Sequence, residues 1–309
     1  LEESAARRPG QADSVVGYSA FGYRERYDKP ANQWEALHRV LRESDLGGVL
    51  GVERTTLPCA LESAVRAEFP DLRLQEATPA LAAARLVKTE EEIARLRRAI
   101  ALTDIGQDAV RRALQPGMTE IALFAAVRGA MEQAAGCRLP IAGDLVAGAE
   151  RTANAGGWPL DIVIGVGDPV IVDLAPRLAG YWGDSCNTLC AGEPAGVFRR
   201  MIQATTEALV KGVEAARPGL RAAELDAVCR RQVESYGYVY AHHSGHALGT
   251  TVHEDPRLVP YEEMPLQAGM VLALEPAAYV SGVGGVRTEH VILITPSGAE
   301  VLSSFAHGL

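Results

Sequence analysis

Four of the chain's seven histidines fall within one short stretch flanked by glycine. The stretch reads HHSGHALGTTVHEDP and contains His242, His243, His246 and His253. Imidazole is the side chain best suited to bind a metal ion or to move a proton near neutral pH. The concentration of histidines therefore predicts a metal or catalytic site here, although each of them taken singly could be structural.

Four acidic residues occupy matching places beside apolar runs. Asp173 ends the run PVIVD, and Asp184 lies eleven residues later, beyond the turn PRLAG. Glu275 ends the run VLALE, and Glu289 follows in VRTEHVILI across a glycine-rich turn. Because side chains alternate along a strand, an antiparallel hairpin can place each pair on one face. The sequence therefore predicts two hairpins that each present two carboxylates in buried surroundings.

Buried carboxylates are costly unless cations or hydrogen-bond donors compensate them. A single acid at a strand end is most often a turn former or a salt-bridge partner, but four in matching positions need more positive charge than Arg177 and Arg287 supply. A pair of divalent cations would balance the acids, and one imidazole would complete a set of oxygen and nitrogen ligands. Such a set suits Mn²⁺ or Co²⁺ better than structural zinc, with Zn²⁺ as the alternative.

Composition narrows the class of protein. The chain of 309 residues is 48% hydrophobic and has a formal net charge of −9, which argues against nucleic acid as the main partner. It contains no apolar run of about 18 residues, so we expect neither a transmembrane helix nor a membrane partner. We find no secretory signal, and the five cysteines form no CxxC pair. These features predict free thiols in a reducing cytoplasm.

Two domains are predicted. In residues 1–85, the stretches NQWEALHRVLRES and LPCALESAVRAEFP read as amphipathic helices, and GGVLGVE and LRLQEAT as strands. This alternation is typical of a small α/β domain. VVGYSAFGY (residues 15–23) is strand-like or irregular. Because the chain starts at Leu1 rather than Met, we expect this domain to lack its first strands.

Residues 86–309 predict a larger α+β domain with an order of elements that occurs twice. Thr89 and Glu92 form a capping box, which starts the first long helix. A pair of helices followed by strands is predicted within residues 89–190 and again within 193–295. The segment after residue 160 reads as strand, turn, strand, turn, strand. The recurrence indicates two halves of similar design.

The motifs quoted above resemble those of a known family. The two aspartates, the histidine stretch, LEPAAY and GGVRTEH are similar to the pita-bread metallopeptidases, which include methionine aminopeptidase, aminopeptidase P, prolidase and creatinase. The resemblance covers residues 86–300. GMVLALEP, the linker RLVKTEEEIARLRRA and the preceding α/β domain resemble the proline-peptidase branch. This implies a pita-bread catalytic domain at 86–309 and a creatinase- or prolidase-like domain at 1–85.

The resemblance also implies a role for each ligand. Asp173 would bind one of two metal ions, and Asp184 and Glu289 would bridge both. His246 and Glu275 would complete the site. Water between two such ions becomes hydroxide at neutral pH and attacks the scissile carbonyl. Glu275 would then carry the proton to the leaving nitrogen.

Other residues are expected near the substrate. His253 would donate a hydrogen bond to the substrate carbonyl or the tetrahedral oxyanion, and His242 would help to position the substrate. Arg287 would hold Glu289 or a substrate carboxylate. We expect His243 to be structural or exposed. The substrate implied is a small peptide with proline second, and the family's dimers and tetramers imply a homodimer.

One departure from the family concerns Gly156. Proline peptidases carry a histidine in a PHG-x-P segment about seventeen residues before the first aspartate. The segment here is NAGGWP, in which Gly156 replaces that histidine while Gly157 and Pro159 keep the register. The family's histidine contacts substrate and stabilises the tetrahedral intermediate. We therefore expect an intact metal site with low peptidase activity or an unusual substrate.

Three functions are compatible with the sequence. The first is a dinuclear metallopeptidase that hydrolyses Xaa-Pro bonds, either as a dipeptidase or as aminopeptidase P. The second is a related metal-dependent hydrolase or lyase acting on a non-peptide small molecule, which Gly156 favours. The third is a non-catalytic binding module, which the retention of five ligands argues against.

Overall fold

The computed structural model describes residues 16, 18, 29–44 and 48–307. The chain divides into two compact units, Leu1–Ala83 and Ala84–Leu309. The stretch VVGYSAFGY lies largely outside the described residues, so its interpretation stays a prediction. In the part of the chain that is described, no helix is long and apolar enough to cross a membrane.

The first unit has the predicted alternation of helices and strands. Its elements are α2 (Lys29–Glu43), β1 (Val49–Val52), α3 (Cys59–Glu68) and β2 (Arg73–Glu76). Strands β1 and β2 pair in parallel, and Leu41, Val65 and Leu74 form a small core. A further helix, α4 (Thr78–Leu86), leads into the second unit. The assignment of residues 1–85 to a creatinase- or prolidase-like domain stays a prediction.

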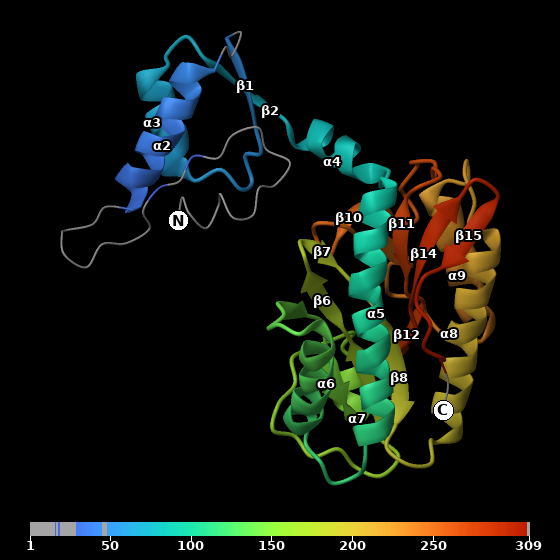
Figure 1. Ribbon diagram of the computed structural model, residues 1–309. Coiled ribbons are helices and arrows are strands. Elements are labelled where there is room, and N and C mark those ends of the chain that lie inside the picture. The colour runs from blue at the N-terminus through green and yellow to red at the C-terminus, as the bar shows by residue number, and fades with distance from the viewer. Residues whose placement is uncertain (1–15, 17, 19–28, 45–47, 308–309) are drawn as a thin grey trace, which may run out of the picture. The chain divides into compact units, whose positions relative to one another are not determined.

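The second unit contains two pairs of long helices. They are α5 (Glu90–Ala113) with α6 (Glu120–Ala135), and α8 (Gly196–Ala215) with α9 (Ala222–Ser235). The members of each pair lie side by side (Figure 1). The predicted capping box is confirmed, because the Thr89 hydroxyl accepts the Glu92 N–H and the Glu92 carboxylate accepts the Thr89 N–H. Helix α6 ends at Gly136 in the left-handed conformation, with φ +66°, as glycine permits.

Strands follow each helix pair, as the sequence predicts. The first set is β3 (Ile141–Ala142), β4 (Leu145–Ala147), β5 (Pro169–Asp173), β6 (Ala175–Leu178), β7 (Tyr181–Trp182) and β8 (Cys186–Cys190), with the short helix α7 (Gly148–Thr152) after β4. The second set is β9 (Gly245–Ala247), β10 (Glu254–Leu258), β11 (Val271–Leu274), β12 (Ala277–Val280), β13 (Gly284–Arg287), β14 (His290–Thr295) and β15 (Gly298–Val301).

The two sets share one design. In the sheet β4-β5-β8, strands β5 and β8 are antiparallel partners. The chain between them forms the short strands β6 and β7, which belong to a separate sheet with β3. In the sheet β10-β9-β11-β14-β15, strands β11 and β14 are antiparallel partners. The chain between them forms the separate hairpin β12-β13. The Glu289 N–H donates to the carbonyl of Cys186 at 2.9 Å and so joins the two halves.

One predicted strand, at residues 161–166, is wrong. This segment forms only an isolated bridge between Val163 and Thr119. It lies at the surface against the start of α6, where Val163 is 62% exposed and Val166 is 82% exposed. The segment is therefore not a strand of the sheet: Ile164 is buried in the core, while Val163 and Val166 on either side of it face solvent.

A buried ion pair fixes the turn after β9. Lys88 Nζ lies 3.0 Å from Glu254 Oε2, and the two side chains are only 2% and 9% exposed. The other oxygen of Glu254 accepts the N–H groups of Thr250 and Thr251 at 2.9 and 3.3 Å. The pair thus holds the segment that connects His246 to His253.

We expect Lys88→Met to destabilise the protein by about 3–5 kcal/mol, because it leaves Glu254 as a buried, uncompensated charge. Chemical denaturation followed by circular dichroism measures the change. Arg97→Met is the matched control, since Arg97 pairs with Glu300 at the surface, where both side chains are more than 40% exposed. That substitution should cost less than about 1 kcal/mol. Equal losses in the two variants would contradict the importance of burial.

Candidate metal centre

The five predicted ligands lie in or next to five different strands. Asp173 ends β5, Asp184 precedes β8, His246 lies within β9, Glu275 follows β11 and Glu289 precedes β14. His246 Nε2 lies 3.3 Å from Glu275 Oε1 and 3.7 Å from Asp184 Oδ2. Ligand atoms of Asp173 and Glu289 lie within 4.8 Å of each other. The structure therefore brings all five residues into one cluster.

Strand register explains this convergence. Leu274 pairs with His290 across β11 and β14, so the next residue on one strand, Glu275, faces the preceding residue on the other, Glu289. Asp173 pairs with Cys186 across β5 and β8, and Asp184 lies two residues before Cys186. Because residues two apart share a face, Asp184 lies diagonally beside Asp173.

The cluster is largely buried, and its carboxylates are poorly compensated. Asp184 and Glu289 are 4% and 1% exposed. Oε1 of Glu275 and Oε1 of Glu289 are buried and have no hydrogen-bond partner. Burial raises the pKa of Glu275 to about 8. Burial, followed by repulsion from Asp173, raises the pKa of Asp184 well above its usual range.

The histidine at the centre of the cluster has one ring nitrogen free to bind a cation. His246 Nδ1 lies 3.0 Å from the carbonyl of Ala247, which can only accept, so Nδ1 carries the proton and Nε2 presents a lone pair to Asp184 and Glu275. Burial lowers the pKa of His246 to about 3, which keeps the ring neutral. Metal-binding histidines use the same backbone support. Unpartnered carboxylate oxygens and a bare imidazole nitrogen fit divalent ions.

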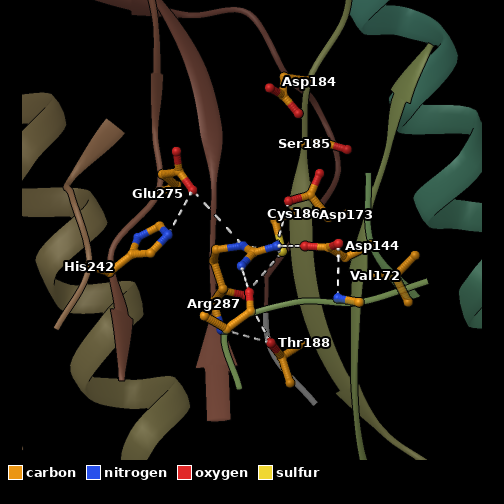
Figure 2. Close-up of polar contacts among 12 residues, drawn as sticks. Asp144, Val172, Asp173, Asp184, Ser185, Cys186, Thr188, His242, Glu275 and Arg287 are labelled. Carbon is orange, nitrogen blue, oxygen red and sulfur yellow. Dashed lines mark hydrogen bonds and ion pairs between the residues drawn. The ribbon is translucent and has the colours of Figure 1, made fainter. Parts of the chain in front are cut away.

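Arg287 is the positive group that lies deepest in the site. Its side chain is 3% exposed, and its guanidinium points between the acids of the two halves (Figure 2). Its five N–H groups donate to Cys186 Sγ, Ala155 O, Tyr279 Oη, Asp144 Oδ2 and Asp173 Oδ2. Arg287 therefore holds Asp173 and not, as expected, Glu289, and a role at the substrate stays a prediction.

His242 and His253 both lie next to the cluster, and each has a ring contact with His243. His242 Nε2 is 3.8 Å from Glu275 Oε2, and its ring contacts that of Tyr279 at 5.8 Å between centroids. The His253 ring lies 4.2 Å from that of His246, nearly perpendicular to it. Both rings lie beside the candidate metal centre, and their contact with a substrate stays a prediction.

Two residues of the site were missed in the sequence. His243 is half-buried, and its Nε2 lies 3.3 Å from Glu275 Oε1; its three-residue spacing from His246 was the available signal. Asp144 carries no motif. It reaches the site because β4 pairs with β5 and places Leu145 opposite Val172, which brings Asp144 opposite Asp173.

The five cysteines are free thiols, as predicted. Cys186 is buried, and its Sγ lies within 4.8 Å of ligand atoms of Asp173 and Glu289. Burial raises the pKa of the Cys186 thiol well above its usual range. Since the thiolate is the form that binds metals, the protonated Cys186 favours a site made of oxygen and nitrogen ligands.

We expect the metal-free protein to lose stability as the pH rises from about 6.5 to about 8.5. The pKa of Glu275 is about 8 in the fold, against an ordinary value of 4.5, so the folded state holds a proton that the unfolded chain has released. This stabilisation is complete below the unfolded pKa and is lost as the pH rises through the folded pKa. Buried histidines oppose the trend only below about 6.5, the ordinary histidine pKa.

Thermal unfolding of chelator-treated protein across this range measures the effect. Glu275→Gln removes one of the titrating groups and should make the decline shallower. A melting temperature that rises with pH over the same range would contradict the assignment of buried, protonated acids.

Comparison with known proteins places the chain in a family. The model of metallopeptidase family M24 matches residues 94–296. The Xaa-Pro dipeptidase of Pyrococcus furiosus is 35% identical over 221 residues, which are 71% of this chain and 63% of that protein. The chain thus matches less than two thirds of that relative's length.

Solved structures show the same architecture. The Xaa-Pro dipeptidase from Bacillus anthracis superposes with a TM-score of 0.82 at 29% identity, covering 89% of this chain and 78% of that one. The X-Pro aminopeptidase from Thermotoga maritima gives a TM-score of 0.81 at 25% identity, covering 88% and 77%. The predicted α+β pita-bread fold is confirmed. The chain belongs to the metal-dependent M24 metallopeptidases, in the branch of the Xaa-Pro dipeptidases and aminopeptidase P.

Proposed function

We propose that this chain is a dinuclear metal-dependent peptidase that hydrolyses Xaa-Pro bonds in small peptides. The observation that carries the proposal is the convergence of Asp173, Asp184, His246, Glu275 and Glu289 on one buried point, with carboxylate oxygens that lack partners. The names of the relatives, Xaa-Pro dipeptidase and X-Pro aminopeptidase, support the substrate class. Mn²⁺ or Co²⁺ suits the oxygen-rich ligands, with Zn²⁺ as the alternative.

Each residue has a distinct task in this proposal. The five predicted ligands would hold two divalent ions, which would lower the pKa of a bound water and polarise the scissile carbonyl. Glu275 accepts a proton from the attacking water and passes it to the leaving nitrogen. His253 donates a hydrogen bond to the oxygen on which negative charge develops. His242, beside Glu275 Oε2, orients the substrate, and Arg287 holds Asp173 through its ion pair.

A second candidate function is that of a hydrolase or lyase that acts on a non-peptide small molecule at the same centre. Gly156 presents no side chain, and the carboxylate of Asp144 lies against it. The site therefore offers an acceptor where the family's histidine offers a donor, which favours a substrate of different polarity. A non-catalytic binding module is the weakest alternative, because all five metal ligands are present. Cytoplasmic location and a homodimer remain part of the first proposal.

The proposal is tested by loading chelator-treated protein with Mn²⁺ or Co²⁺ and offering peptides of two to five residues with proline second. We expect release of the N-terminal residue, measured by chromatography of the products. Cleavage of Ala-Pro alone would indicate a dipeptidase, and cleavage of longer peptides an aminopeptidase. Failure to cleave any of them, with both metal ions bound, would favour the second candidate.

Asp184→Asn and Glu289→Gln should abolish both metal binding and turnover, because each removes a carboxylate that would bind both ions. Metal content after gel filtration and the rate of Ala-Pro hydrolysis measure the two effects. Retention of two ions per chain by either variant would contradict its bridging role.

His253→Ala should leave the metal content unchanged while lowering kcat by about 10²–10³-fold, the cost of removing one donor to a developing oxyanion. Steady-state kinetics and metal analysis separate the two properties. A variant with the full rate would remove His253 from the mechanism.

A further inference from the structure

Asp144 is a fifth carboxylate at the metal centre and lies at its rim. Its side chain is 29% exposed, whereas that of Asp173 is 16% exposed. Oδ1 accepts the N–H of Gly157 at 3.0 Å, and Oδ2 accepts from Arg287 Nη2 at 3.0 Å. The carbonyl of Asp144 accepts the N–H of Asp173 at 2.8 Å. Backbone and side chain are thus both tied to the neighbourhood of the first predicted ligand.

The absence of a side chain at residue 156 makes room for this carboxylate. A Cβ built on Gly156 would lie 2.2 Å from Asp144 Oδ2 and 2.7 Å from its Cγ. Any larger residue at 156 therefore displaces the Asp144 side chain from its present position. Ala155 adopts a left-handed conformation, with φ 63°, and its carbonyl accepts from Arg287 Nη1. The turn at 155–157 therefore contacts both Asp144 and Arg287.

Arg287 is shared between two carboxylates. The same nitrogen, Nη2, donates to Asp144 Oδ2 at 3.0 Å and to Asp173 Oδ2 at 2.6 Å (Figure 2). The other donors of the guanidinium are engaged by Tyr279 Oη, Cys186 Sγ and the carbonyl of Ala155, so the group cannot turn away. Without Asp144, the whole charge of Arg287 would act on Asp173 and compete with a cation for its oxygens.

We propose that Asp144 is a positioning residue that anchors Arg287 and balances its charge, so that Asp173 keeps its affinity for a divalent ion. This inference rests on the proposed dinuclear site. Gly156 is part of this arrangement, because only a residue without a Cβ leaves room for the Asp144 side chain to reach Arg287. The chain thus uses the space at position 156 to tune a metal ligand from a distance.

The test is titration calorimetry of chelator-treated protein with Mn²⁺. Wild-type protein should bind two ions, and Asp144→Asn, which keeps the size of the side chain but removes its charge, should bind one of them about 10–100-fold more weakly, as for other partners of metal ligands. The visible absorption spectrum of the Co²⁺-loaded variant should also change. Thermal unfolding without metal confirms that the variant is folded.

A second pair of variants tests the role of Gly156. Gly156→Ala should weaken metal binding in the same direction, because its Cβ displaces Asp144. Gly165→Ala is the matched control, since its Cβ would lie 2.9 Å from Oδ2 of another aspartate, Asp168, in a turn outside the metal centre. The control should bind both ions as the wild type does. Equal weakening of metal binding in both glycine variants would refute the proposed role of Gly156.

A double-mutant cycle tests whether Asp144 acts through Arg287. In an Arg287→Gln background, Asp144→Asn should have little further effect on metal affinity. An undiminished effect would make Asp144 a ligand in its own right and overturn the inference. Unchanged affinity in Asp144→Asn alone would also overturn it. Failure of the wild-type protein to bind two ions would instead refute the proposed function.

Discussion

The mutual repulsion of the buried carboxylates at the candidate metal centre is the constraint on which this structure depends. Asp184, Glu275 and Glu289 are each at most 5% exposed, so bulk solvent does little to stabilise their charges. In the folded chain without bound cations, protonation reduces this repulsion, and burial raises the pKa of Glu275 to about 8. Folding to this geometry stores an electrostatic cost that a bound cation removes, which is how metal binding and stability become linked.

The two halves of the fold hold these acids together despite their repulsion. Each half places two acids beside a pair of antiparallel strands whose side chains are buried, and the Glu289 N–H to Cys186 carbonyl bond joins the halves at the acids themselves. Rigid apolar strands on both sides leave the carboxylates little freedom to separate. The precision of the site therefore comes from packing, and its chemistry from the few polar groups at the strand ends.

The sequence predicted the parts of the site that depend on local pattern. Asp173 and Glu275 end apolar runs, so strand alternation was enough to single them out, whereas the choice of His246 within the histidine-rich stretch rested on the family resemblance. Asp144 was missed because its place follows from the pairing of β4 with β5, which no local pattern specifies. The strand expected at residues 161–166 failed for the related reason that an apolar run does not reveal which surface it covers.

The charge of the centre explains why Asp144 and Arg287 occur together. With all groups ionised, Asp173, Asp184, Glu275 and Glu289 carry four negative charges, which two divalent ions match. Arg287 adds a positive charge next to Asp173, in surroundings where its side chain is 3% exposed. Asp144 pairs with that charge at the rim, where partial exposure lowers the cost of its own charge. The arginine can then act as a rigid, multiply bonded support for Asp173 without competing with the ions that this ligand is placed to bind.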